Sequence, residues 1–312
     1  MTDSLKITFL GTGAAAPSLT RGLPALAIQR QGKIILCDCG EGTQFRLQQA
    51  GLPPSKIHTI CISHLHGDHI FGLPGFLTSQ QLFGRTASLT IFGPPGMSAY
   101  IDAVAHISKY TLAYPVTVNE LDPAERSEFE IDAFAVTAQN MLHSSPCLGY
   151  RFQESDKPGK FDQAKAEQLG IPQGPSRGQL QKGNSITVNG RTIEPEAVVG
   201  PPIPGRIITY CTDTRPCEAA LQLAHDCDLL ILDSTFSDAY KDRAEPTFHC
   251  TSREAAGIAK QANAKKLALW HLSIRVHGDE EAALLAQARE EFEDSFLPND
   301  LDVISIRRRK TV

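Results

Sequence analysis

The chain has 312 residues, of which 41% are hydrophobic and 21% are charged. These proportions are those of an ordinary globular protein with a sizeable core, so neither disulfides nor a metal ion is needed merely to hold the fold together. The formal net charge of −5 excludes a uniformly basic nucleic-acid-binding protein, although bound divalent cations would reverse the field locally.

The eight cysteines form no Cys-x-x-Cys pair, and several lie inside apolar runs such as Ile60–Ile62. This pattern is typical of small buried side chains in a reducing compartment and not of a disulfide framework. The polar N-terminal residues do not resemble a signal peptide, and no apolar stretch reaches membrane-spanning length. We therefore expect a cytoplasmic enzyme that has no contact with a membrane.

In the first half of the chain, short apolar strands alternate with glycine-rich turns. A helix is predicted over 42–50, because it is followed by Gly51 and by Pro53 and Pro54. A hairpin turn is predicted at Gln31-Gly32. The predicted strands are Leu5–Leu10, Leu26–Gln29, Lys33–Cys37 and His58–Ser63.

The second half repeats this alternation. Helices are predicted at Glu218–His225, Ser252–Ala262 and Asp279–Phe292. Strands are predicted at Phe134–Ala138, Arg206–Cys211, Asp228–Leu232, Lys266–Trp270 and Asp302–Ile306. Polar residues follow the C-terminal ends of five predicted strands, namely Asp38, His64, Asp213, Asp233 and His271. Ligands and catalytic groups collect at that edge of open α/β sheets, so the sequence predicts an α/β protein with two strand–helix halves facing each other.

Residues 153–186 interrupt this pattern. They are rich in Pro and Gly and show little apolar periodicity beyond a short helix-like stretch at Asp162–Leu169. A long segment of this kind is either functional or disordered. Between Arg151 and Lys182 it is only weakly basic, so its charge alone does not indicate RNA binding.

The strongest chemical signal is the sequence His-Leu-His-Gly-Asp-His at 64–69, directly after a predicted strand. Side chains two residues apart point the same way in an extended segment, so His64 and His66 can share one ion while Asp68 and His69 turn towards a second. Imidazole with some carboxylate suits zinc, whereas structural zinc sites are mostly closed and rich in cysteine. The cluster therefore predicts a catalytic zinc site.

Isolated downstream residues must complete such a site. His143 lies in a loop after a predicted strand, while Asp213 and His271 follow two others. A carboxylate has two oxygens, so Asp213 can bridge two ions. A lone histidine is usually an ordinary core or surface residue, and His143 gains its weight only from the pattern that follows.

These motifs resemble those of the ribonuclease Z family, the tRNA 3′-end endonucleases of the metallo-β-lactamase superfamily. The resemblance covers nearly the whole chain. It rests on Phe9–Ala14 with Pro17 and Arg21, Cys37–Gln44, the unbroken Ile62–Gly75 metal loop, Asp213–Pro216 and His271–Arg275. It implies one domain over residues 1–312 with the four-layer αββα fold, and a flexible tRNA-binding arm inserted at 153–186.

The same resemblance implies two zinc ions per chain. It assigns one ion to His64, His66 and His143, the other to Asp68, His69 and His271, and a bridging position to Asp213. It further implies precursor tRNA as substrate, a homodimer, and a Gly-Pro motif of the arm at Gly174 and Pro175 that binds the substrate.

Catalytic roles follow as hypotheses. Asp68 binds metal and accepts the proton of the nucleophile, while His249, oriented by Asp233, protonates the leaving oxygen. Ser273 and Arg275 are candidate phosphate contacts, with a surface ion pair as the alternative for Arg275. The Gly40–Gln44 segment and a turn at Gly72–Gly75 are expected to line the cleft.

The sequence departs from the family pattern near these catalytic candidates. Asp233 stands where the family has a longer glutamate, and Leu232 replaces the histidine before it. Cys250 replaces a serine after His249, and Val276 replaces a tyrosine. These changes affect the predicted proton donor and not the metal ligands.

Two other functions remain open from the sequence. One is a hydrolase of small or cyclic phosphodiesters, for which the 153–186 segment would be dispensable. The other is a non-catalytic RNA-binding subunit, which the complete ligand set argues against because such a subunit would be free to lose ligands.

Overall fold

The computed structural model describes residues 3–308, which form two compact units. The first unit consists of the chain up to Phe152 and of Ile207–Ile306. The second unit consists of Gln153–Arg206 together with the residues from Arg307 onwards. Within residues 3–308, no helix is long and apolar enough to cross a membrane.

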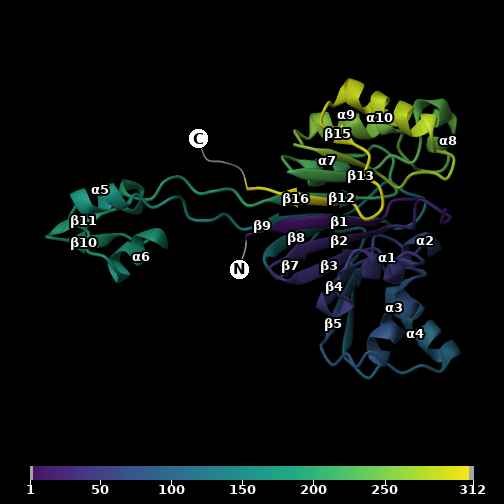
Figure 1. Cartoon of the computed structure of the whole chain (residues 1–312), viewed down its shortest axis with the longest axis horizontal. Coiled ribbons are helices and arrows are strands. Elements are labelled where there is room, and N and C mark those ends of the chain that lie inside the picture. The colour runs from purple at the N-terminus through teal and green to yellow at the C-terminus, as the bar shows by residue number, and fades with distance from the viewer. Residues whose placement is uncertain (1–2, 309–312) are drawn as a thin grey trace. The chain divides into compact units, whose positions relative to one another are not determined.

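The first unit contains two seven-stranded sheets between layers of helices (Figure 1). In the first sheet, β16, β1, β2 and β3 pair antiparallel, and β3 to β6 pair parallel. Its strands are, in order, β16 (Val303–Ile306), β1 (Leu5–Gly11), β2 (Ala25–Arg30), β3 (Lys33–Cys37), β4 (Ile57–Cys61), β5 (Leu89–Gly93) and β6 (Val116–Glu120).

The second sheet has a parallel half, in which β12 to β15 pair in chain order. Its strands are, in order, β15 (Ser295–Phe296), β14 (Leu267–Trp270), β13 (Leu229–Asp233), β12 (Ile207–Cys211), β9 (Leu148–Glu154), β8 (Phe134–Asn140) and β7 (Ser127–Ile131). The parallel strands matter for function, because the polar residues that the sequence singled out lie at or just beyond the C-terminal ends of β3, β4, β12, β13 and β14.

Helices cover the outer face of each sheet (Figure 1). The helices next to the first sheet are α1 (Thr43–Gln49), α2 (Gly67–Ile70), α3 (Leu73–Leu82) and α4 (Met97–Ser108). Those next to the second sheet are α7 (Glu218–Ala224), α8 (Lys241–Ala244), α9 (Ser252–Gln261) and α10 (Asp279–Glu291). Short 3-10 turns lie at Pro54–Lys56 (η1) and Asp238–Tyr240 (η3).

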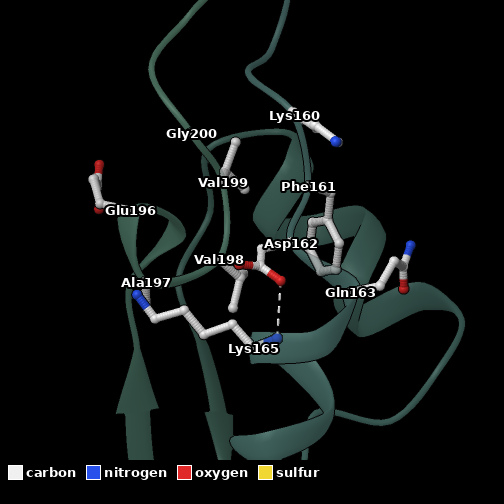
Figure 2. Close-up of a pocket in the computed structure, with 10 residues that line it drawn as sticks. All are labelled: Lys160, Phe161, Asp162, Gln163, Lys165, Glu196, Ala197, Val198, Val199 and Gly200. Carbon is white, nitrogen blue, oxygen red and sulfur yellow. Dashed lines mark hydrogen bonds between the residues drawn. The ribbon is translucent and has the colours of Figure 1, made fainter. Parts of the chain in front are cut away.

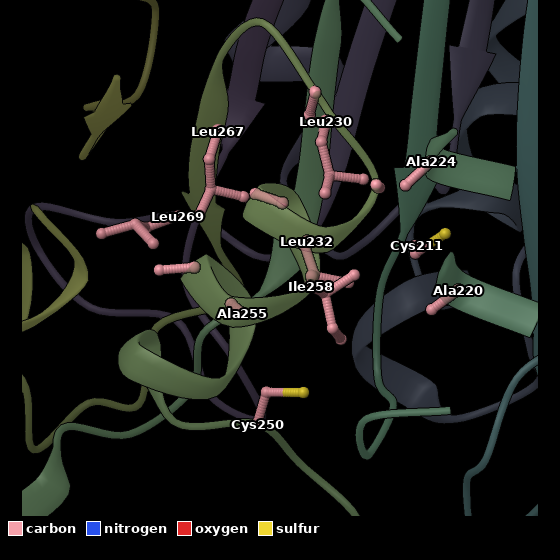
Figure 3. Close-up of a cluster of buried hydrophobic side chains, with 14 of the residues drawn as sticks. Cys211, Ala220, Ala224, Leu230, Leu232, Cys250, Ala255, Ile258, Leu267 and Leu269 are labelled. Carbon is pink, nitrogen blue, oxygen red and sulfur yellow. The ribbon is translucent and has the colours of Figure 1, made fainter. Parts of the chain in front are cut away.

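Three buried clusters hold these layers together. The central cluster combines side chains from both sheets, with the Trp270 ring 5.7 Å from Phe9 and 6.0 Å from Tyr210. Two further clusters join each sheet to its helices, and Figure 3 shows the one beneath α7 and α9, where Leu230 and Ile258 are buried. The first unit is therefore the αββα sandwich implied by the resemblance.

The predicted helices and strands of the first unit are present with ends shifted by a few residues, as in β4, which ends at Cys61 and not at Ser63. One prediction is wrong: Gly72–Gly75 is not a turn but the start of α3, with Pro74 in its first turn. Proline is tolerated there because the first helical N–H groups have no partner inside the helix.

The second unit is a small fold with its own core. It contains α5 (Gln163–Gln168), α6 (Pro175–Gln181), the hairpin β10 (Ile186–Val188) and β11 (Arg191–Ile193), and a 3-10 turn η2 (Pro195–Ala197). The predicted helix-like stretch is confirmed as α5, which Asp162 caps by accepting the Lys165 N–H at 3.0 Å. The buried side chains of this core are Phe161, Ala166, Ile171, Leu180, Ile193 and Val198.

The two chain segments that enter and leave the second unit are hydrogen-bonded to each other. Lys157 and Ile203 exchange two backbone hydrogen bonds of 2.9 Å. Glu154 and Arg206, both buried, form a bidentate ion pair with distances of 2.6 and 2.7 Å. The unit thus extends to Arg206, beyond the 153–186 range expected from composition.

Candidate metal centre

Three imidazoles and one carboxylate oxygen form the first ligand cluster, His64, His66, His143 and Asp213, whose ligand atoms lie within 4.8 Å of one another. His66 Nδ1 lies 3.0 Å from His64 Nε2 and 3.3 Å from His143 Nε2. His64 Nε2 lies 3.5 Å from Asp213 Oδ2. These residues come from the segment after β4, the loop after β8 and the end of β12.

A second cluster joins Asp68, His69 and His271. His69 Nε2 lies 3.3 Å from His271 Nε2 and 3.6 Å from Asp68 Oδ2. Asp213 reaches this cluster as well, because its Oδ1 is 3.3 Å from both His69 Nε2 and His271 Nε2. The two oxygens of Asp213 therefore face different clusters, which is the geometry of a bridging carboxylate.

The spacing of these atoms fits zinc. With zinc–ligand bonds of roughly 2.0–2.1 Å, a tetrahedral arrangement places neighbouring ligand atoms about 3.3 Å apart. The measured separations of 3.0–3.6 Å surround that value in both clusters. Imidazole nitrogens and carboxylate oxygens, without a thiolate in either cluster, are the donor set of catalytic sites.

The non-ligating nitrogens of two imidazoles are held by buried partners. Asp38 Oδ2 lies 2.8 Å from His69 Nδ1 and also accepts hydrogen bonds from the Ser63 hydroxyl (2.8 Å) and the Tyr210 hydroxyl (2.6 Å). Thr235 Oγ1 lies 3.0 Å from His271 Nδ1. Such contacts fix the tautomer and leave Nε2 for the metal.

The pKa values of the buried histidines His64 and His69 are shifted in opposite directions. Burial and the His69 ring hold the pKa of His64 well below its usual range, so its imidazole is neutral as a metal ligand requires. Burial lowers the pKa of His69 as well, but the carboxylates of Asp213 and Asp38 outweigh it and raise that pKa well above its usual value. Metal binding at His69 would therefore displace a proton.

The backbone at three of these positions is strained. Asp38, Asp213 and His271 have φ angles of 57°, 46° and 62°, in the left-handed region that non-glycine residues rarely occupy. Asp38 and His271 directly follow β3 and β14, and Asp213 lies two residues after the end of β12. Strain of this kind clusters at functional sites, where the surrounding structure over-determines the conformation.

The predicted proton donor lies beside the second cluster. His249 Nδ1 is 2.7 Å from Asp233 Oδ2, so the shorter aspartate of this chain reaches the imidazole. Asp233 is fixed by the Thr214 and Thr235 N–H groups, each at 2.9 Å. Burial lowers the pKa of His249, but the Asp233 carboxylate outweighs it and raises that pKa to about 9.

The chain is similar to several known proteins. Residues 5–146 match the family described as anti-Pycsar protein Apyc1. Ribonuclease Z of Methanosarcina acetivorans is 40% identical over 305 residues, covering 98% of this chain and 99% of the relative. Ribonuclease Z of Halorubrum lacusprofundi is 41% identical and covers 97% of each chain.

The chain belongs to the ribonuclease Z family. Among solved structures, human tRNase Z, short form, is 29% identical with a TM-score of 0.71, covering 97% of this chain and 99% of that one. YhfI of Bacillus subtilis, a metallo-β-lactamase fold protein, is 19% identical with a TM-score of 0.69, covers 97% and 100% of the two chains, and shows the fold alone.

The remaining predicted site residues of this ribonuclease Z family member lie in two places. Ser273 is buried near Thr235, whose carbonyl accepts its N–H. The Arg275 side chain is exposed and makes no ion pair within residues 3–308, so the surface ion pair considered from the sequence is absent there. Gly174 and Pro175 are exposed at the start of α6, in the second unit.

One basic side chain of the second unit is buried in its interior. Arg177 is buried and donates to the Ile171 carbonyl at 3.0 Å, so it is a structural contact. A pocket of about 560 Å³ lies in this unit, and Figure 2 shows Lys160, Asp162 and Lys165 among the residues that line it. Two lysines, Lys160 and Lys165, and two acidic residues, Asp162 and Glu196, are among the residues that line it.

Sequence reasoning placed Asp38 at the correct rim but gave it no role, and it missed Tyr210 and Thr235 entirely. A signal for Asp38 was present, because a carboxylate between two apolar cysteines needs a buried partner. Tyr210 lies inside a strand and Thr235 beyond one, so neither carries a local pattern that indicates a metal-site contact.

Proposed function

We propose that this protein is a zinc-dependent endoribonuclease that cuts the 3′ trailer from precursor tRNA, leaving a 3′-hydroxyl on the tRNA and a 5′-phosphate on the trailer. The observation that carries the proposal is Asp213, whose two oxygens face separate ligand clusters in a chain of the ribonuclease Z family. Two zinc ions held in this way would activate a water molecule and neutralise charge on the phosphate.

The side chains of the chain itself supply proton transfer. Asp68 Oδ2 accepts the Ala15 N–H at 2.8 Å, which orients the carboxylate at the rim of the site. We propose that Asp68 accepts the proton of the attacking water. The raised pKa of His249 keeps its imidazole protonated at neutral pH, so it can donate a proton to the departing 3′-oxygen.

We propose that the second unit binds the tRNA away from the cut, with Gly174 and Pro175 among its contacts. Its exposed lysines and its separate hydrophobic core support this role. We also propose a cytoplasmic homodimer. The eight free cysteines support a reducing compartment, and sedimentation of the purified protein at about twice the chain mass would support the dimer.

A labelled substrate tests the function directly. We expect one cut after the discriminator nucleotide of a 5′-labelled precursor tRNA carrying a 3′ trailer, together with about two zinc ions per chain. A variant in which residues 158–202 are replaced by Asn-Gly keeps the Lys157–Ile203 pair as the base of a two-residue hairpin.

This shortened variant should lose precursor cleavage while still hydrolysing bis(p-nitrophenyl) phosphate. If instead the intact protein turns over the small diester and never cuts the precursor, the substrate is a small or cyclic phosphodiester. Hydrolysis of neither substrate by the zinc-loaded protein, with tRNA still bound, would indicate the non-catalytic subunit.

A further inference from the structure

Arg215 follows Asp213 by two residues and makes three short hydrogen bonds in a half-buried position. Its Nη1 donates to the His249 carbonyl at 2.6 Å and to Glu254 Oε2 at 2.7 Å, and its Nη2 donates to Glu254 Oε1 at 2.6 Å. Bidentate pairs of this type are strong and geometrically specific. The guanidinium therefore fixes the backbone of the residue proposed to donate the proton.

The backbone of Arg215 is fixed too. Its N–H donates to the Leu142 carbonyl at 2.9 Å, and Thr214 Oγ1 accepts the Leu142 N–H at 3.2 Å. Leu142 precedes His143, a member of the first ligand cluster. Arg215 thus connects three site-bearing segments, the Asp213 strand end, the His143 loop and the segment before α9.

Glu254, the ion-pair partner, is itself held in a capping box. Its N–H donates to the Thr251 hydroxyl at 3.3 Å, and its Oε2 accepts the Thr251 N–H at 2.9 Å. Because α9 packs in a buried cluster of the second sheet, Glu254 is anchored to the rigid part of the unit. The His249 carbonyl is tied through Arg215 to this helix end.

We propose that Arg215 is a positioning residue that holds His249 in place to protonate the departing oxygen. The inference rests on the proposed function. Three N–H groups of the guanidinium are committed to Glu254 and the His249 carbonyl, so Arg215 acts through His249. Its effect must then depend on how much protonation the leaving group requires.

Two substrates separate this role from a merely structural one. The 3′-oxygen of a ribose departs as a poor, strongly basic leaving group and needs a proton, whereas p-nitrophenolate departs as a stable anion. For Arg215→Gln we expect a kcat on precursor tRNA about 10–100-fold lower, because positioned proton transfer contributes roughly 10²–10⁴-fold. KM should stay within about twofold, and hydrolysis of bis(p-nitrophenyl) phosphate within about threefold.

Matched variants complete the design. Arg215→Lys keeps one charged donor and should restore part of the lost kcat. Arg253→Gln removes the arginine of α9, which pairs with Asp238 and Glu290 on the surface, and should leave both activities unchanged. Zinc content and the thermal midpoint of each variant show that the site and the fold are intact.

A double-mutant cycle gives the decisive result. In a His249→Ala background, Arg215→Gln should cause no further loss of precursor cleavage, because residues that act through one another are not additive. Equal losses of activity on both substrates, or a further loss of precursor cleavage in the His249→Ala background, would overturn the role of Arg215 but leave the proposed function standing. A wild-type enzyme that does not cut the precursor contradicts the proposed function itself.

Discussion

The two units of this protein differ in how firmly they hold their side chains. In the first, most metal-site side chains are buried, and His69, His271 and His249 each have a second contact on the other ring nitrogen. In the second, six buried hydrophobic residues support short helices and a three-residue-per-strand hairpin. Placing reactive atoms to within tenths of an ångström takes a large framework, whereas presenting a few exposed side chains does not.

This contrast predicts that the two units can be damaged separately. A small core supplies little stability, so the second unit should unfold before the first. Changes in it should alter tRNA affinity, and changes around Asp213 should alter chemistry on every substrate.

The largest effect is expected from Asp213→Asn, which leaves both ligand clusters without their shared negative charge. Loss of metal-based charge stabilisation is worth several kcal/mol, so activity on precursor tRNA and on bis(p-nitrophenyl) phosphate should both fall by about a thousandfold or more. Metal analysis should show less than two zinc ions per chain. Retained cleavage with full zinc content would contradict the bridging role.

Core truncations in each unit test their independence. Leu180→Ala in the second unit and Leu230→Ala in the first remove equally buried side chains, each at a cost of about 2–5 kcal/mol. Leu180→Ala should raise KM for precursor tRNA without affecting the small diester, and Leu230→Ala should lower the thermal midpoint of the zinc-loaded protein. Hydrogen exchange resolved by peptide measures which unit opens, and equal exchange in both units would argue against separate unfolding.

An intermediate effect on zinc affinity is expected from Asp38, which contacts His69 but is not itself a proposed metal ligand. Asp38→Asn removes the carboxylate charge beside His69 Nδ1 and should weaken zinc binding about 10–100-fold, as measured by competition with a chelator. Asp132→Asn is the control, because that aspartate pairs with Lys33 and His58 on the surface. Similar zinc affinity in both variants would show that Asp38 does not tune the metal.

The smallest effects come from helix caps. Asp162→Ala removes the N-cap of α5 and Thr251→Ala that of α9, each worth about 1 kcal/mol. The first should raise KM for precursor tRNA only, whereas the second should lower kcat, because Thr251 supports Glu254 and the His249 segment. Steady-state kinetics on both substrates distinguish the two variants. If both variants changed KM and kcat in the same way, the two units would not have separate roles.

Much of the candidate metal site could be predicted from the spacing of residues close together in the sequence. His64, His66, Asp68 and His69 lie within six residues, so their chemistry was visible before any fold was known. The alternation of strands and helices placed Asp213 and His271 at the same rim. Pairing His143 with them required the family resemblance, because a single histidine in a loop has no pattern of its own.

Contacts between distant segments could not be predicted. The Tyr210 hydroxyl reaches Asp38 across 172 positions of the chain, and no periodicity encodes that pair. The second unit was underestimated for another reason. Its core residues, such as Phe161 and Leu180, are too widely spaced in the sequence to show a helical or strand period. The sequence-based interpretation of this segment therefore rested on its Pro and Gly content.

The proposed metal ligands come from both sheets. His64 and His69 follow the first sheet, and Asp213 and His271 follow the second, so an ion in either cluster would cross-link both halves of the sandwich. A ligand bound only by the native state stabilises it, by about 2.7 kcal/mol at one hundred times its dissociation constant, and calorimetry with and without a chelator would measure this gain. Zinc supply would then govern how much of the enzyme persists in the cell, because a metal-starved chain visits the unfolded state more often and is open to proteolysis.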